Sequence, residues 1–303
     1  MTSLAFLLLA ISAFVHAGWN LVCKRQCPTQ LFFFLTSMVG FVLLSPLLLY
    51  HWARLAEIPA AVWWRLLATG FFMALYYIAL AGAYRVGDLS VIYPLARALP
   101  ILLITFVSFL LGRGDEIGRL AIVGILLVVT GCFLLPMQRF DGWRLRNYMN
   151  AGCALALLAA VGTTGYTVID DLGVAELRAP PARLFGAMEA AFLYQGLQAF
   201  SSMLWQGLGM LLVRDDGSGR DNAAFAHQWK SALIAGIGIY LAYGLALTAM
   251  AHVSDVSYVA AFRQLSIPIG AAGGIFLLKE PCYGPRVVGV VTILAGLLLV
   301  GLG

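Results

Sequence analysis

The stretch from residue 96 to residue 135 reads ARALPILLITFVSFLLGRGDEIGRLAIVGILLVVTGCFLL, and it consists of two long apolar runs separated by the short polar segment GRGDE. An apolar run of about twenty residues is long enough to cross the roughly 30 Å hydrocarbon core of a bilayer as a helix. Helices suit lipid because they satisfy their own backbone hydrogen bonds. The stretch therefore predicts two membrane-spanning helices joined by a tight loop.

The rest of the chain has the same character. Of its 303 residues, 62% are hydrophobic and only 11% are charged, and the mean hydropathy is +0.91. Soluble domains carry about a quarter charged residues, because their surfaces face water. The sequence thus predicts an all-α membrane protein with ten transmembrane helices. The predicted spans lie near residues 3–22, 30–50, 62–84, 89–111, 117–137, 149–169, 186–212, 230–251, 256–278 and 284–302.

Charge and cysteine content argue against several classes of partner and cofactor. The formal net charge is +5, but the basic residues are scattered, which is typical of loops beside anionic lipid rather than of a nucleic-acid site. Five dispersed cysteines without a CxxC pair argue against a disulfide framework or a zinc site. No GxxxxGK[ST] loop occurs, so no ATP hydrolysis through that device is expected. We therefore predict no cofactor and no metal.

The two halves of the chain resemble each other. YYIALAGAYRVGDLS at residues 76–90 aligns with YGLALTAMAHVSDVS at residues 243–257. Each half holds five predicted spans, and because five is odd, the second half must be inverted relative to the first. Inverted repeats give many secondary transporters two alternative openings around one midplane site. The sequence predicts a first repeat over residues 1–140 and a second over residues 141–303.

The last span of each half carries the strongest shared marks, an acidic residue in the preceding loop and two glycines seven positions apart. These residues are Glu116, Gly124 and Gly131 in the first half and Glu280, Gly289 and Gly296 in the second. Together with the stretch 96–135 and the closing LLKEPCYGPRVVGVVTILAGLLLVGLG, they resemble EamA-type transporters of the drug/metabolite transporter superfamily. The resemblance covers nearly the whole chain. It implies a ten-span fold and the transport of a small metabolite such as an amino acid, a sugar or a sugar phosphate.

Several polar residues have structural explanations. The paired glycines predict close helix packing. Glu116, Glu189 and Glu280 lie near span starts, where the helix dipole favours an acid. Asp170 and Asp171 lie at a predicted span end and are expected to be solvated. The first span contains no Asp or Glu, which argues against the proton-for-cation exchange that small multidrug-resistance relatives perform on a first-span carboxylate.

Two arginines lie inside predicted spans. Arg97 and Arg263 are eight to nine residues into the fourth and ninth spans, and on the repeat alignment Arg97 falls on Gln264. An arginine at mid-bilayer costs about 2.5–3.5 kcal/mol on insertion scales and is usually retained for function. Two guanidinium groups suit a carboxylate or phosphate, which they bind through paired N–H donors. The alternative is a structural role, with each arginine held by an internal acid or by carbonyl groups freed near prolines.

Aromatic side chains accompany the arginines. Tyr93 lies one helical turn before Arg97, while Tyr76, Tyr77 and Tyr243 lie on the equivalent third and eighth spans. An aromatic cavity with a few polar tips is typical of small-molecule sites. Ordinary helix packing or an interfacial aromatic belt is the alternative.

The first span carries a polar stripe. Ser12, His16 and Asn20 are spaced four apart, and Trp19 lies beside them. The corresponding residues of the second half are Thr163, Tyr166 and Thr167. His16 is either a proton carrier, since an imidazole titrates near neutral pH, or a neutral hydrogen-bonding residue between helices.

These features predict a secondary transporter for a small polar metabolite, such as an amino acid or an organic or phosphorylated anion, working by alternating access in a bacterial inner membrane. Its predicted partners are a small-molecule substrate and membrane lipid, with no nucleic acid.

Two alternative functions fit less well. An intramembrane enzyme would need a nucleophile–base pair or a metal cluster, and a non-transporting assembly protein would leave the midplane arginines unexplained. Basic-residue counts place the termini outside and the resemblance implies cytoplasmic termini, so both orientations stay open. The predicted substrate-binding residues are Arg97, Arg263, Tyr93, Gln264, His16, Trp19, Asn20, Tyr76, Tyr77, Tyr243, Thr163 and Tyr166.

Overall fold

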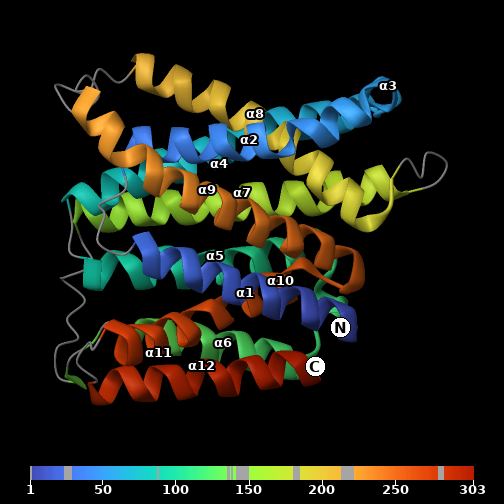
Figure 1. Cartoon of the computed structure of the whole chain (residues 1–303). Coiled ribbons are helices and arrows are strands. Elements are labelled where there is room, and N and C mark those ends of the chain that lie inside the picture. Colours follow the sequence, from blue (N-terminus) through green and yellow to red (C-terminus); the bar gives the residue numbers. More distant parts are fainter. Residues whose placement is uncertain are drawn as a thin grey trace.

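The computed structural model describes a bundle of long helices (Figure 1). The described residues are 2–23, 29–86, 89–134, 137, 139–140, 150–179, 185–212, 222–278 and 283–303. The first half contains α1 (Ser3–Cys23), α2 (Gln30–Tyr50), α3 (Trp52–Leu55), α4 (Ala60–Val86), α5 (Leu89–Leu110), η1 (Gly114–Glu116) and α6 (Arg119–Leu134). The second half contains α7 (Ala151–Arg178), α8 (Ala187–Leu212), α9 (Asn222–Ala249), η4 (Met250–His252), α10 (Val256–Phe262), η5 (Arg263–Leu265), α11 (Ser266–Leu278) and α12 (Gly284–Leu302).

The predicted all-helical membrane class is confirmed for the described residues. All of their regular elements are helices, and five have the length and the apolar composition needed to cross a membrane. These five segments are Gln30–Tyr50, Ala60–Ala83, Ala151–Arg178, Trp229–His252 and Gly284–Leu302. Shorter apolar helical segments lie at Ser3–Trp19, Ala96–Leu110 and Arg119–Leu134.

Local signals in the sequence set several helix ends. The Thr29 hydroxyl caps α2 by accepting from the Phe32 N–H at 3.1 Å, and the Asn150 side chain caps α7 by accepting from the Cys153 N–H at 2.9 Å. Each cap satisfies a backbone donor that the first helical turn leaves free. After α5, the chain turns through Gly112, whose φ of +75° lies in the region that favours glycine. Polar caps and a glycine turn thus mark the ends of otherwise apolar helices.

The distribution of polar side chains is that of a protein in lipid. Large apolar side chains such as Phe14, Trp64 and Phe276 are exposed on the outside, where they would face acyl chains. By contrast, Gln195 and Thr69 are fully buried between helices. In a bilayer, polar side chains are satisfied by neighbouring helices rather than by solvent, so their place is the bundle interior.

Glycines allow α6 and α12 to pack closely, as the sequence predicts. A Cβ on Gly124 would come within 2.5 Å of the Gly296 carbonyl oxygen. A Cβ on Gly131 would come within 2.7 Å of the Gly289 carbonyl oxygen. A Cβ on Gly296 would in turn come within 2.6 Å of the Gly124 carbonyl oxygen. Gly124, Gly131 and Gly296 are therefore required for the close approach of the two backbones.

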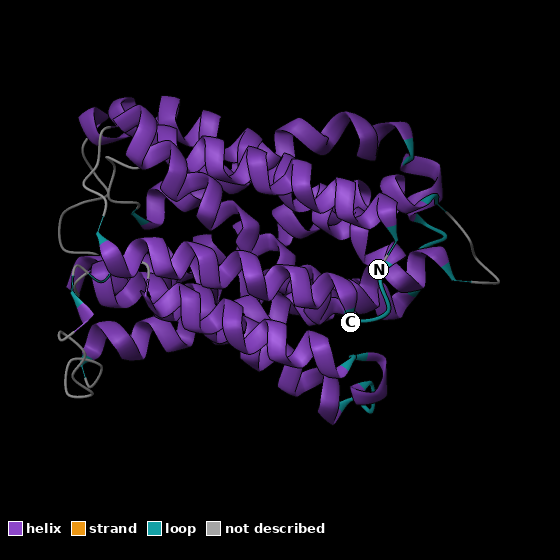
Figure 2. Ribbon diagram, turned by 90° about the horizontal axis from the view of Figure 1, so that it is seen from below, coloured by secondary structure: helices purple, strands orange, loops and turns teal. Residues whose placement is uncertain are grey.

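Helices of the first half pack extensively on helices of the second. The main pairs are α4 with α7 and α8, α9 with α1 and α2, α5 with α7 and α10, α1 with α11, α2 with α8, and α6 with α12. Both chain termini lie at the same end of the bundle (Figures 1 and 2). We call this the termini end. The two halves thus share one interior, and the candidate site lies within it.

One predicted span is interrupted. The segment 256–278 is not a single helix, because α10 ends at Phe262 and the 3-10 turn η5 separates it from α11. Pro268 lacks the N–H that would bond the Gln264 carbonyl in a continuous helix. The Ser266 hydroxyl also binds the Arg263 carbonyl at 2.8 Å, and the Gln264 amide binds the Ala260 carbonyl at 3.2 Å. Side chains that bond nearby carbonyls compete with regular helix in this way.

Candidate functional site

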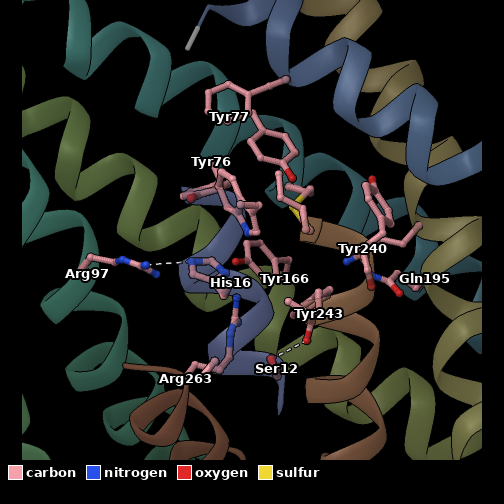
Figure 3. Close-up of a pocket in the computed structure, with 17 residues that line it drawn as sticks. Ser12, His16, Tyr76, Tyr77, Arg97, Tyr166, Gln195, Tyr240, Tyr243 and Arg263 are labelled. Atoms are coloured by element: carbon pink, nitrogen blue, oxygen red, sulfur yellow. Dashed lines mark hydrogen bonds between the residues drawn. The ribbon is translucent and has the colours of Figure 1, made fainter. Parts of the chain in front are cut away.

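A cavity of about 70 Å³ lies between the two halves (Figure 3). Eight of the predicted substrate-binding residues line it. They are His16, Trp19, Tyr76, Tyr77, Arg97, Tyr166, Tyr243 and Arg263. They come from α1, α4, α5, α7, α9 and η5, so residues far apart in the sequence meet at one place. Their role as substrate ligands stays a prediction.

The other four predicted residues are not part of the described lining. Thr163 and Gln264 are not among the residues that line the cavity. Asn20 and Tyr93 lie on α1 and α5, but their side chains fall outside what the structure describes, as do Asp88 and Glu280 entirely. The repeat alignment places Gln264 level with Arg97, yet in the broken segment it is Arg263, one position earlier, that faces the cavity.

Arg97, the arginine of the first half, is held by His16 of the polar stripe on α1. Arg97 Nη2 lies 2.8 Å from His16 Nε2. A guanidinium group can only donate hydrogen bonds, so His16 Nε2 must accept, and the imidazole is neutral in this arrangement. The Trp19 ring packs edge-on against His16 with ring centroids 5.2 Å apart. The Arg97–His16 contact favours the interpretation of His16 as a neutral residue between helices over its interpretation as a proton carrier.

The arginine of the second half is held by an aromatic ring. The guanidinium carbon of Arg263 lies 5.0 Å from the centroid of the Tyr243 ring, which is a cation–π arrangement. Arg97 and Arg263 approach His16 from different sides (Figure 3). Among the described residues, no carboxylate forms an ion pair with Arg263. A direct ion pair with a described acid therefore does not account for the place of Arg263 in the bundle interior.

Tyrosines form much of the cavity wall. The rings of Tyr76 and Tyr166 meet edge-on with centroids 5.9 Å apart, and those of Tyr166 and Tyr243 meet edge-on at 5.6 Å. Phe33, which the sequence did not suggest, stacks on Tyr77 at 4.6 Å and adds α2 to the wall. Such edge-to-face and stacked contacts make a rigid apolar surface with hydroxyl tips.

The lining is electropositive and retains unused hydrogen-bonding groups. It includes two arginines, while no Asp or Glu is among the described lining residues. The Trp19 indole N–H is buried without a partner in the described part of the chain. Gln195 and Gln198 also line the cavity, and each has a side-chain oxygen without a described partner. The cavity thus offers both donors and acceptors to a ligand.

No cluster of three His, Cys, Asp or Glu side chains that could hold a metal is present in the described ranges.

The expectation that Asp170 and Asp171 are solvated is wrong. Asp170 is fully buried and accepts from Thr69 Oγ1 at 2.5 Å, from Gln198 Nε2 at 2.7 Å and from the Tyr243 hydroxyl. Asp171 is mostly buried and pairs with Arg113, with 2.8 Å between Nη1 and Oδ2. The predicted span ended at residue 169, whereas α7 continues to Arg178, so both carboxylates lie about two turns inside the helix.

A sequence signal for Asp170 did exist. Thr163, Thr167 and Asp170 are spaced four and three apart, so they lie on one face of a helix. The polar stripe of the second half therefore extends further than its counterpart on the first span, and it ends in a carboxylate. A longer assignment of the sixth span would have placed Asp170 in the bundle interior.

Comparisons with known proteins agree with the fold. The EamA-like transporter family matches residues 3–137 of the chain. No curated protein matches the chain significantly. One solved structure, described only as the crystal structure of a protein, superposes with a TM-score of 0.70 and 16% sequence identity over 100% of this chain and 98% of the other. At that identity, the likeness shows a shared fold and nothing about the substrate.

Three findings indicate a membrane protein. They are the helices suited to a membrane, the polar interior shared by the two halves, and the family match. The protein is an integral, multi-pass membrane protein. Over residues 3–137 the chain resembles the EamA-like transporter family of the drug/metabolite transporter superfamily, which indicates a transporter-type protein.

Proposed function

We propose that the protein is a secondary transporter for a small organic anion, which binds between Arg97 and Arg263 at the interface of two inverted five-helix repeats. The proposed repeats are residues 1–140 and 141–303, ten spans in all, in a bacterial inner membrane. The observation that carries the proposal is the pair of guanidinium groups in one cavity whose described lining contains no carboxylate. An arginine at membrane depth costs free energy, and such residues are usually functional.

The packing of the helices supports the repeat. Exchanging each helix of the first half for its counterpart in the second maps α4–α7 onto α9–α1, and α4–α8 onto α9–α2, while α2–α8 and α6–α12 map onto themselves. Such a pattern is expected of two repeats related by a pseudo-twofold axis in the membrane plane. Termini at one end of the bundle require an even number of crossings, which two five-span repeats provide.

The cavity chemistry supports an anionic substrate with a second polar group. Arg97, Arg263 and the Trp19 indole supply N–H donors, which suit a carboxylate or phosphate. Gln195 lies away from Arg97 in Figure 3, and its free oxygen can accept from an amino or hydroxyl group. Amino acids, hydroxy acids and phosphorylated metabolites carry both groups. Tyrosine rings between these ends would contact the carbon skeleton.

The size of the cavity and two ion pairs support alternating access. The cavity volume of about 70 Å³ is well below the roughly 300–1,000 Å³ of a typical open ligand site. Towards the termini end, the two halves are joined by the ion pairs Arg113–Asp171 and Arg65–Glu176. We propose that this conformation is closed on that side, and that opening it would separate both pairs.

Transport by the purified protein in proteoliposomes tests this proposal. A panel of amino acids, organic acids and phosphorylated metabolites would be offered for uptake and counterflow, beside matched neutral and cationic analogues. We expect movement of at least one anionic or zwitterionic solute and none of its analogue without the acidic group. If only neutral or cationic solutes move, the assignment of the arginines is wrong.

A further inference from the structure

Asp170 is a buried carboxylate that the proposed anion site does not use. It is fully buried on α7, and the donors that bind it, Thr69, Gln198 and Tyr243, are all neutral. Among the residues that the structure describes, no Lys, Arg or His forms an ion pair with it. By comparison, Asp255 is also buried, but it caps α10 by accepting from the Ser257 N–H at 2.8 Å. Asp170 lies inside α7 and caps no helix end.

The network around Asp170 suits both a carboxylate and a carboxylic acid. The hydroxyls of Thr69 and Tyr243 now donate to Asp170, but a hydroxyl can also accept. If Asp170 took up a proton, either hydroxyl could rotate and accept a hydrogen bond from the carboxylic acid. The group could therefore change its protonation state without breaking an ion pair and without moving a helix.

One side chain connects this network to the anion site. Tyr243 lines the cavity, donates its hydroxyl proton to Asp170, and carries the Arg263 guanidinium over its ring. The Arg263 guanidinium lies over the face of the ring whose hydroxyl donates to Asp170, and a positive charge nearby favours an ionised carboxylate. An anion bound to Arg263 would cancel that charge and so favour the protonated acid. Anion binding and proton binding are thereby linked.

We propose that Asp170 is a proton-binding site that takes up a proton when an anion binds between Arg97 and Arg263, so that the two cross the membrane together. This inference rests on the proposed function. The proton passes from the cavity to the Asp170 carboxylate by way of the Tyr243 hydroxyl, and it leaves on the other side after the anion has left. Because linkage is reciprocal, a proton on Asp170 also strengthens anion binding.

Few other groups compete for this role. The titratable or charged groups that face this region from the elements packed on α7 are Arg65 on α4, Arg97 on α5, Tyr194 on α8, Tyr243 on α9 and Asp255 at the start of α10. Arg65 pairs with Glu176 and Arg97 binds His16. Asp171, next to Asp170 in sequence, pairs with Arg113. Within the cavity itself, His16 is the alternative proton acceptor.

Proton uptake on anion binding tests the proposal without any transport assay. Purified protein in a weakly buffered detergent solution with a pH-sensitive dye would be titrated with sulfate or methanesulfonate, neither of which takes up a proton near neutral pH. We expect proton uptake on anion binding, up to a limit of one proton per anion, because the linkage joins one proton site to one anion site. Asp170→Asn should bind the anion with little or no proton uptake. Asp115→Asn, which removes an exposed carboxylate in η1, is the control and should keep the uptake.

Tyr243→Phe is a second variant in case Asp170→Asn does not yield folded protein, as judged by size-exclusion chromatography. It keeps the ring under Arg263 and removes a hydroxyl that donates to Asp170. The ionised carboxylate then loses a donor, more of Asp170 is protonated before the anion binds, and uptake per bound anion should fall. Anion binding by the natural protein without proton uptake would overturn the proton site and leave the anion site standing. Uptake that survives in Asp170→Asn and disappears in His16→Gln would place the proton on His16. If neither anion binds, the anion site fails and this inference fails with it.

Discussion

Helix α5 and the segment α10–η5–α11 occupy corresponding places in the two halves, yet only the second is broken. Arg97 lies on a continuous helix and bonds to His16, whereas Arg263 begins the 3-10 turn and lies over Tyr243. Leu99 in α5 corresponds to Ser266, whose hydroxyl binds the Arg263 carbonyl. The two halves thus hold the same charge in different ways. We infer that α5 is the fixed side of the site and that the broken segment is the side that moves.

Removing either arginine is expected to have the largest effect. Arg97→Ala and Arg263→Ala should each lower uptake at least tenfold, a loss of about 1.4 kcal/mol or more, because each deletes one of the two cationic groups. Uptake of the solute identified in the panel would be measured at equal amounts of folded protein. Arg119→Ala, an exposed arginine at the start of α6, is the matched control and should behave like the natural protein. Normal transport by both cavity variants would refute the anion site.

Restoring a continuous helix should have an intermediate effect. Ser266→Ala combined with Pro268→Ala removes the hydroxyl that binds the Arg263 carbonyl and restores a backbone N–H for the Gln264 carbonyl. We expect slower amide hydrogen exchange around residues 263–266 and uptake reduced severalfold, because Arg263 would turn away from the cavity. Pro100→Ala on α5 is the corresponding control and should change little. Equal effects of the two changes would mean that the break has no special role.

Changing the partner of Arg97 should have the smallest effect. His16→Gln keeps a side-chain acceptor for Arg97, so uptake should fall about two- to threefold, which is less than 1 kcal/mol, with an unchanged pH profile. His16→Ala removes the acceptor and should lower uptake further. A pH profile that flattens in His16→Gln would show instead that His16 carries the proton.

The sequence predicted the parts of the fold that depend on composition and periodicity. Apolar length located the helices, and the paired glycines predicted close helix packing, which the structure shows between α6 and α12. The arginines were found because a charge in an apolar run is conspicuous. What the sequence could not show was the break at η5, since Pro100 and Pro268 look alike, and only the contacts of Ser266 and Gln264 distinguish the two segments.

The candidate site was predicted less completely. Phe33 and Gln198 belong to the cavity, but an apolar ring or a single amide in a span carries no signal by itself. Asp170 was misplaced because hydropathy ended its span too early, and a helix can extend beyond its apolar run when neighbouring helices supply hydrogen bonds. Contacts between helices distant in sequence, such as Tyr243 with Asp170, depend on the folded arrangement.

The central claim is that a small anion binds between Arg97 and Arg263. Selenate, a sulfate analogue whose selenium can be located by anomalous X-ray scattering, would be soaked into crystals of the protein. We expect an anomalous peak within hydrogen-bonding distance of both guanidinium groups, and loss of that peak in Arg263→Ala. A cavity without a peak, while selenate binds elsewhere on the protein, would contradict it.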